Sequence, residues 1–330
     1  MRTGSVRWLP WVIAAALLVG SAGGTAFVAL VGSREPVREE LPEVSLALPL
    51  APDDLGSAAP GDLEAPGSRA AAGGPPLLLD AALLEPTAHG GLPRIAADGR
   101  RVSELHRRRS QPSGRARAGI VLVGIGLDRS AAASAVQLPG VVTLAVSPYA
   151  EDAPRWFRVA RWRGHETLME LPVRPVGYPL DDAGPLAIAA VPADLDRLER
   201  VLARSTGYLG LAVRAGVLAD RPVDAPPIAS VLASRGVALV ELGTRVLEQA
   251  ARAAGLPYLP AAGPIDVEPT TPAIDAALAD LEARARASGS ALAYGRPLPI
   301  TIDRIARWSA SLADRDVELV GVGALLDAPR

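Results

Sequence analysis

From Gly119 onward, short apolar runs alternate with amphipathic stretches of helical periodicity. Val, Leu and Ala follow one another in these runs without polar alternation, which is typical of strands covered on both faces. The runs are IVLVG (120–124), VVTLAV (141–146), ETLMEL (166–171), YLGLAV (208–213), VALVEL (237–242), PYLPA (257–261), SALAY (290–294) and VELVGV (317–322). This order predicts an α/β fold with a parallel sheet, either closed into a barrel or open and doubly wound.

Both folds place functional side chains at the carboxyl ends of the strands. The residues at these ends are Gly124 to Asp128, Ser147 to Asp152, Pro172 to Asp182, Arg214, Glu241 to Arg245, Asp266 and Tyr294 to Arg296. Asp128 precedes a helical stretch, so we predict that it caps the helix rather than binding a metal. A dinucleotide site is the rival enzyme class, but GIGLDR has Arg129 in place of the third glycine.

The N-terminus reads as a membrane anchor. The chain has no charged residue from Trp8 to Ser33. A helix of this length can cross a hydrocarbon layer of about 30 Å. Arg2 and Arg7 precede this run, so we expect a single-pass anchor over residues 1–33 in the inner (cytoplasmic) membrane. The C-terminal domain is then exported to the periplasm. A cleaved signal peptide is the alternative, although its apolar region would be shorter.

Residues 34–118 are rich in Pro, Gly, Ala and acidic residues, a composition that buries too little apolar surface to offset the entropy of ordering. We predict a disordered linker with a basic end here, followed by a folded domain over 119–326. His89 and His106 lie in this linker and receive no role. His165 is then the single imidazole of the predicted domain.

Charge and cysteine content exclude several classes of function. The formal net charge of −2 gives no overall attraction to nucleic acid, and we expect no such partner. The absence of cysteine removes disulfides, thiolate metal sites and cysteine nucleophiles.

The order of VTLAVSPYA, GHETLMELPVRPVGYPLDDAGP, STGYLGLAVRAG, ELGTR, GLPYLP and LPITIDRIARW resembles the divergent polysaccharide deacetylases. The resemblance covers residues 91–325. It implies a distorted (β/α) barrel of seven or eight units, an envelope location and an ancestral activity of hydrolysing acetyl groups on sugars.

The polar positions of this family are only partly kept. Its first Asp pair falls on Val123-Gly124, its Asn and Arg on Val213 and Leu218, its second Asp pair on Glu241-Leu242, and its glutamate on Arg174. The positions that match are His165, Glu166, Pro172, Pro175, Tyr178, Asp182, Gly243 and Thr244. Metal-dependent deacetylation needs imidazole and carboxylate ligands. HETLM begins like HExxH but ends in Met169, a poor ligand, so we expect no cofactor and disfavour a divalent metal.

His165 and Glu241 are the candidate catalytic residues. A buried histidine most often bonds a backbone carbonyl and shapes a turn, but His165 becomes a general acid or base if a carboxylate lies within reach. Glu241 is either a base or a helix cap. The candidate binding residues are Arg174, Tyr178, Asp182, Arg214, Thr244 and Arg296; the three arginines suit an anionic group.

Two functions follow from different classes. In the first, the chain is a deacetylase-like hydrolase of acetylated sugars whose activity is reduced or lost. In the second, it is a degenerate, non-catalytic barrel that binds an envelope polysaccharide or an envelope protein.

Overall fold

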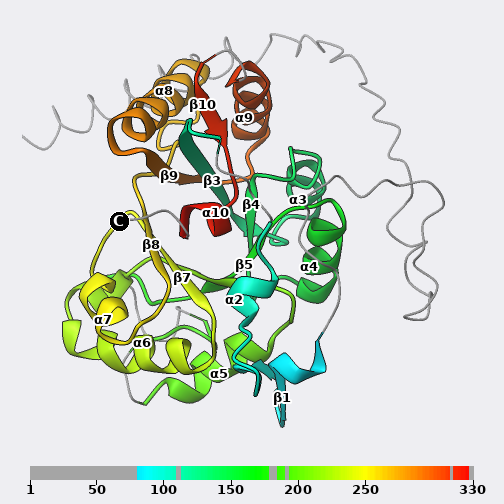
Figure 1. Cartoon of the computed structure of the whole chain (residues 1–330), viewed down its shortest axis with the longest axis vertical. Coiled ribbons are helices and arrows are strands. Elements are labelled where there is room, and N and C mark those ends of the chain that lie inside the picture. Colours follow the sequence, from blue (N-terminus) through cyan, green and yellow to red (C-terminus); the bar gives the residue numbers. More distant parts are fainter. Residues whose placement is uncertain (1–79, 109–112, 178–183, 190–192, 313–314, 327–330) are drawn as a thin grey trace, which may run out of the picture. The chain divides into compact units, whose positions relative to one another are not determined.

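In the computed structural model of the chain, the described residues are 80–108, 113–177, 184–189, 193–312 and 315–326. All of them belong to the second of two compact units, residues 67–330. Figure 1 colours these residues along the sequence. The predicted anchor, 1–33, lies outside these residues. Among the described residues, no helix is long and apolar enough to span a bilayer.

The main sheet has eight strands that pair in parallel. They are β3 (Ala116–Ile125), β4 (Thr143–Val146), β5 (Thr167–Leu171), β6 (Gly210–Val213), β7 (Ala238–Leu242), β8 (Tyr258–Ala261), β9 (Ser290–Gly295) and β10 (Val317–Leu319). The order is β10-β3-β4-β5-β6-β7-β8, and β9 also pairs with β3. Because β9 returns to the first long strand, the sheet curves back on itself.

The remaining gap lies between β8 and β9. Backbone hydrogen bonds of 2.8 Å bridge it, from Ala262 N–H to Leu292 O and from Ile265 N–H to Tyr294 O. The sheet is therefore a nearly closed barrel of parallel strands, as predicted. β10 extends one edge of β3 at its amino end, where Val317 pairs with Ala116.

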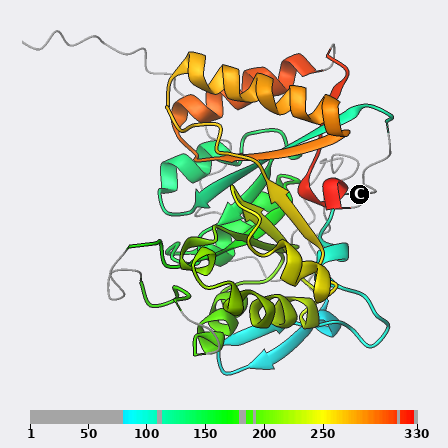
Figure 2. The same cartoon turned by 90° about the vertical axis from the view of Figure 1, so that its left-hand side faces the viewer.

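Helices cover the outside of the barrel. They are α3 (Arg129–Ala135), α4 (Ala153–Trp162), α5 (Leu195–Ala203), α6 (Ala225–Ser234), α7 (Glu248–Ala253), α8 (Thr271–Ser288) and α9 (Pro299–Ser311), with the short turns η3 (Gly216–Ala219) and η4 (Pro222–Asp224). Asp128 caps α3 by accepting from Ala131 N–H at 2.7 Å, as predicted. Helices α8 and α9 lie side by side, and α8 packs on β9 and β3 (Figure 2).

Alternating strand residues sort into two cores. Side chains such as Ile120, Leu144 and Leu239 pack outward against the helices, whereas neighbours such as Val121, Ala145 and Ala238 fill the barrel. The last helix, α10 (Val322–Leu326), also contributes to the inner core. A Cβ on Gly119, near the start of β3, would lie 2.6 Å from Leu325 Cδ1, so α10 closes the amino end of the barrel.

Residues 80–108 are folded, so the predicted linker over 34–118 is wrong for this segment. It contains η2 (Ala81–Leu83), the antiparallel pair β1 (Leu84–Thr87) and β2 (Gly90–Pro93), and α2 (Val102–Leu105). Leu83, Leu92 and Val102 are buried in the outer core. Three apolar residues spaced along the segment pack it against the barrel, although its average composition is typical of a disordered linker.

The docked segment, residues 80–108, also buries a histidine that received no role from the sequence. His106 is 4% exposed, and its Nδ1 lies 2.7 Å from Nη1 of the buried Arg161, which also donates to Gly207 O at 2.6 Å. Burial, reinforced by Arg161, lowers the pKa of His106 to about 3. This histidine therefore accepts from the arginine as a neutral ring.

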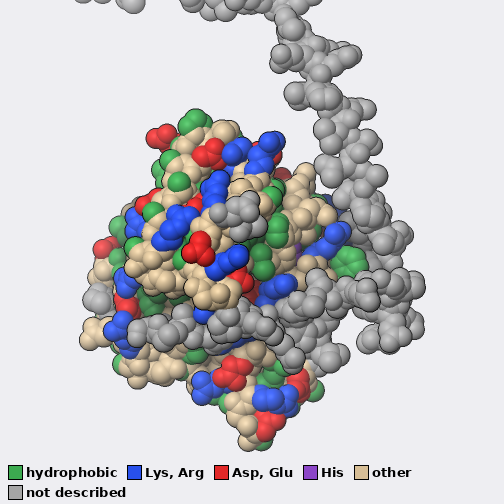
Figure 3. Space-filling view, turned by 45° about the horizontal axis from the view of Figure 1, so that its top comes forward, with side chains coloured by type: hydrophobic (Ala, Val, Ile, Leu, Met, Phe, Trp, Pro, Cys, Tyr) green, Lys and Arg blue, Asp and Glu red, His purple; other side chains and the backbone are tan. Residues whose placement is uncertain are grey.

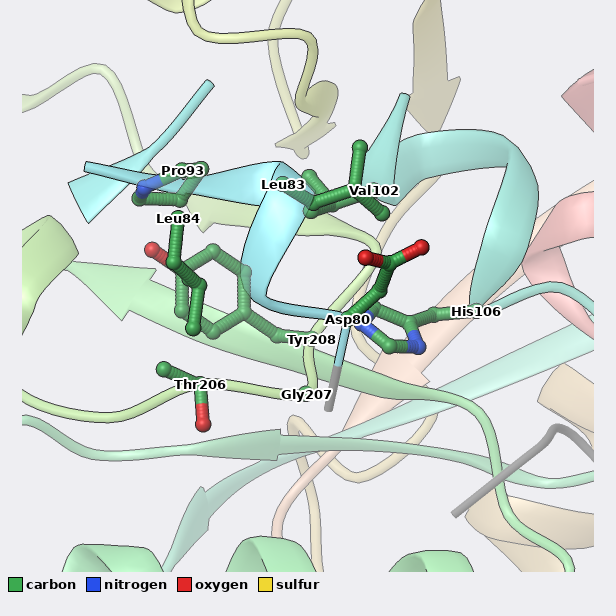
Figure 4. A pocket seen from close by; sticks show the side chains of 9 residues that line it. All are labelled: Asp80, Leu83, Leu84, Pro93, Val102, His106, Thr206, Gly207 and Tyr208. Carbon is green, nitrogen blue, oxygen red and sulfur yellow. The ribbon is translucent and has the colours of Figure 1, made fainter. Parts of the chain in front are cut away.

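A small cavity remains where this segment meets the barrel (Figure 4). Its walls come from the docked segment and from the residues that precede β6: Asp80, Leu83, Leu84, Pro93, Val102, His106, Thr206, Gly207 and Tyr208. The cavity volume is about 10 Å³, which fits a single water molecule at most. The contact is thus a packed interface.

Candidate functional site

Three polar side chains meet on the inner face of the barrel at the carboxyl ends of the strands. Leu168 and Ala212 belong to the inner core. Side chains two residues apart on a strand share a face, so Glu170 of β5 points inward like Leu168. Arg214 directly follows β6, and its charge acts on Glu170. Tyr294 of β9 is also part of the inner core. We call Glu170, Arg214 and Tyr294 the mouth cluster.

Glu170 is half-buried and accepts a hydrogen bond from Gly124 N–H, just before the end of β3. Burial raises the pKa of its carboxyl, while the Gly124 bond and the charge of Arg214 act in the opposite direction. Arg214 itself is exposed. The pair offers an acceptor and a donor to a ligand at the mouth.

Tyr294 is 8% exposed, and its hydroxyl lies beside Gly243. A Cβ on Gly243 would be 3.1 Å from Tyr294 Oη, and the φ of 78° there also favours glycine. Burial raises the pKa of the phenol and Arg214 opposes the increase. The charge of Arg214 thus acts on both Glu170 and Tyr294.

Of these three residues, only Arg214 was a predicted site residue. Tyr294 was predicted only as a strand-end position, and Glu170 lies within the apolar run ETLMEL, to which no site was assigned. The signal for Glu170 is the two-residue alternation within TLMEL, which a continuous apolar run obscures.

Arg296 is tied to Asp266 at the edge of the mouth. The buried Asp266 accepts from Arg296 N–H at 2.7 Å and from Thr301 Oγ1 at 3.1 Å. The guanidinium donates from Nη2 to Asp266 O at 2.9 Å. The pair of bonds fixes the turn between β9 and α9, so Arg296 has a structural partner on this rim.

His165 lies at the opposite, amino end of the barrel and is fully buried. Its Nδ1 is 2.8 Å from Val142 O and its Nε2 is 3.2 Å from Val136 O. Burial lowers the pKa of the ring, although both carbonyls favour its charged form. The histidine thereby joins the start of β5 to the connection between α3 and β4.

Glu241 is also fully buried, but it points outward from β7 toward the helix layer. Its carboxylate accepts from Thr244 Oγ1 at 2.5 Å, Val246 N–H at 2.7 Å and Leu247 N–H at 3.0 Å. It also accepts from Tyr258 Oη at 2.7 Å. The predicted site residues Glu241 and Thr244 therefore cap the turn before α7.

The two predicted catalytic residues do not meet. Leu168, Gly210 and Ala238 are neighbours in register across β5, β6 and β7. His165 lies three residues before this level and Glu241 three residues after it. At about 3.3 Å per residue the two are separated by roughly 20 Å along the strands. They cannot act on one substrate atom.

The other predicted binding residues lie after β5. Arg174 is half-buried, and its backbone donates to Ile188 O and accepts from Val217 N–H, both at 2.9 Å. Tyr178 and Asp182 lie outside the described residues.

Within the described ranges, no group of three His, Asp or Glu side chains could hold a metal ion. A deacetylase-type cation would sit at the mouth, where the mouth cluster supplies one carboxylate. That carboxylate already accepts from Gly124 and faces the guanidinium of Arg214, which repels a cation. The donor set of the mouth cluster does not fit a divalent ion.

On the face shown in Figure 3, acidic and basic side chains are interspersed without a patch of one sign.

Comparisons with known proteins agree with the fold. The model of the family described as "Divergent polysaccharide deacetylase" matches residues 120–326. A crystal structure of an uncharacterized protein, ATU2773 from Agrobacterium tumefaciens C58, is 32% identical with a TM-score of 0.68, covering 72% of this chain and 99% of that one. A putative cellobiose-phosphate cleavage protein (EF3048) from Enterococcus faecalis V583 is 11% identical with a TM-score of 0.46, covering 64% of this chain and 99% of that one, a likeness too low to support an argument. No curated protein matches the chain. With a family match over most of its length and a barrel shared with a relative, the chain belongs to the divergent polysaccharide deacetylase family.

Proposed function

We propose that this chain binds a saccharide at the mouth of its barrel, and that the deacetylase activity of its family is reduced or lost. The observation that supports this most is the mouth cluster. Glu170 offers an acceptor, Arg214 a donor, and the Tyr294 hydroxyl can do both. A few convergent polar groups on an apolar wall suit a ligand rich in hydroxyls.

The positions of His165 and Glu241 argue against their sharing a hydrolytic step. Each is fully buried, and each is engaged by hydrogen bonds within its own end of the barrel. A general base must come within hydrogen-bond reach of the water that it activates. Neither residue borders the mouth cluster.

Binding and turnover are tested in the same preparation of the full chain in detergent. Calorimetry against neutral, acetylated and acidic oligosaccharides is expected to give binding that Arg214→Gln weakens about tenfold, as one charge-assisted hydrogen bond would. Arg115→Gln is the matched control, because Arg115 is an exposed arginine just before β3, at the other end of the barrel. Equal loss in both variants would argue against a site at the mouth.

Acetate release from acetylated amino-sugar oligomers is measured with and without added divalent cations. We expect none above the rate of a buffer blank. If the wild-type chain releases acetate and Glu170→Gln abolishes that release, the chain is catalytic and the mouth is its site. This result would overturn the part of the proposal that the activity is lost.

We further propose that the chain is held in the inner membrane by residues 1–33, with the barrel in the periplasm. The support is the uncharged run from Trp8 to Ser33 preceded by Arg2 and Arg7. Alkaline phosphatase fused after residue 326 should be active in intact cells. An inactive fusion of full length would contradict this orientation.

A further inference from the structure

A hollow opens at the carboxyl ends of the strands, between the loops that follow β3 and β4. It has a volume of about 190 Å³ and is lined in part by Gly126, Leu127, Tyr149, Glu151 and Trp156. We call it the rim cleft. The site proposed above does not include any of these residues, so the rim cleft needs its own explanation.

The rim cleft exposes apolar surface that the fold does not use. Leu127 is 63% exposed and Tyr149 is 39% exposed, and both count among the exposed large hydrophobic residues of the described chain. The Tyr149 ring is held in place, because its hydroxyl accepts from Leu186 N–H at 3.2 Å. A fixed and partly exposed aromatic ring is a surface on which the C–H face of a pyranose can pack.

Polar groups stand beside this apolar surface. Glu151 is exposed and makes no hydrogen bond or ion pair with another described residue. Trp156 Nε1 donates to no described residue and borders Gly126, where a Cβ would lie 3.2 Å from it. An aromatic face flanked by a carboxylate acceptor and an indole donor matches a ring that carries C–H groups on one side and hydroxyls at its edge.

The rim cleft is joined to the mouth by one short loop. Gly124 N–H donates to Glu170 of the mouth cluster, and Gly124 O accepts from Leu127 N–H at 3.3 Å. Leu127 in turn lines the rim cleft. The loop from Gly124 to Leu127 therefore borders both the mouth cluster and the rim cleft.

We infer that the rim cleft is a second saccharide subsite and that the ligand is an oligosaccharide of two or more units. This inference rests on the proposed function, since it extends the ligand held by the mouth cluster. The first unit contacts Arg214 and Glu170, and the next packs on Tyr149 with its hydroxyls toward Glu151 and Trp156.

The test compares ligand lengths on the full chain. The probes are glucose and N-acetylglucosamine with their β-1,4-linked dimers to tetramers, titrated by calorimetry. We expect the dimer to bind about three- to tenfold more tightly than the monomer, the range that one aromatic contact supplies. Tyr149→Ala should remove this gain and leave monomer affinity unchanged. Tyr149→Phe keeps the ring but loses the bond from Leu186 N–H, so it should retain more of the gain than Tyr149→Ala does.

Trp162→Ala is the matched control, because Trp162 is a 51% exposed aromatic at the other end of α4. It should leave all affinities unchanged. Monomer binding that needs Arg214 but shows no gain with length would overturn the subsite and leave the proposed function standing. A gain with length that survives Tyr149→Ala would place the second unit elsewhere and also overturn it. No binding of any probe would overturn both.

Discussion

The Oε2 atom of Glu166 accepts a hydrogen bond from Gly323 N–H at 2.8 Å, although the two residues are 157 positions apart. Its Oε1 accepts from Arg108 N–H at 2.7 Å. A carboxylate that is 1% exposed thereby joins β5, α10 and the docked segment at the closed end of the barrel.

Glu166→Ala is expected to lower the free energy of unfolding by about 3 kcal/mol, because it leaves the buried Gly323 N–H and the half-buried Arg108 N–H unpaired. Urea unfolding followed by circular dichroism measures the change. Glu268→Ala is the control, since Glu268 is exposed and its side chain makes no hydrogen bond with a described residue. An equal effect in both variants would show that the network carries no stability.

His106 predicts acid sensitivity. Its folded pKa of about 3 lies below the ordinary value of 6.5, so unfolding takes up a proton and stability falls as pH drops through this window. The slope is at most about 1.4 kcal/mol per pH unit. His106→Gln keeps an acceptor for Arg161 without titrating, so its stability should fall less between pH 6.5 and 3. Parallel profiles would contradict a neutral, buried ring.

The buried hydrogen bond from Tyr258 Oη to Glu241 is expected to contribute strongly to stability. Tyr258→Phe should cost about 2 kcal/mol, as for a hydrogen bond to a charged group, and less than 1 kcal/mol when Glu241 is already changed to Leu. Tyr208→Phe is the comparison, because its hydroxyl is equally buried but donates to the uncharged Leu202 O at 2.6 Å. Denaturant titration of the four variants gives the coupling. Additive costs would contradict it.

The docked segment predicts a boundary for the folded unit. A chain of residues 67–330 should melt cooperatively at the temperature of the full chain. A chain of residues 113–330 loses Leu83, Leu92, Val102 and the Arg108 bond to Glu166, and should aggregate or melt at a much lower temperature. Differential scanning calorimetry makes the comparison. Equal melting temperatures for the two chains would show that residues 80–108 do not stabilise the barrel.

The backbone at Gly126, beside the rim cleft, leaves no room for a side chain. Its φ is 91°, and a Cβ would lie 2.6 Å from Ala150 Cβ and 2.8 Å from Trp156 Cδ1. Gly99 has a similar φ of 87° with no atom within 4 Å. Gly126→Ala should therefore destabilise the chain by about 1–3 kcal/mol more than Gly99→Ala, the range for overpacking, in thermal unfolding. Equal costs would mean that the loop moves aside freely.

The parallel α/β sheet was predictable because its signal is local, whereas its closure into a barrel was implied by the family resemblance. Runs such as VALVEL reflect burial on both faces, and the order of strands and helices then leaves few parallel arrangements. The docked segment was missed because Leu83, Leu92 and Val102 are spaced too widely for a periodic pattern. His106 was dismissed for the same reason, since its partner Arg161 is 55 residues away.

The sequence by itself determined the parallel α/β sheet and the Asp128 cap, because strand burial, helix periodicity and capping depend on neighbours in the chain. The order of its motifs indicated the family, and through it the barrel. Only the tertiary structure decided the site. A strand has two ends and two faces, and which of them a side chain occupies depends on pairing register and on distant segments. Strand register and distant contacts place His165 at the closed end and Glu241 against the helix layer. They also place Glu170, Arg214 and Tyr294 at the mouth.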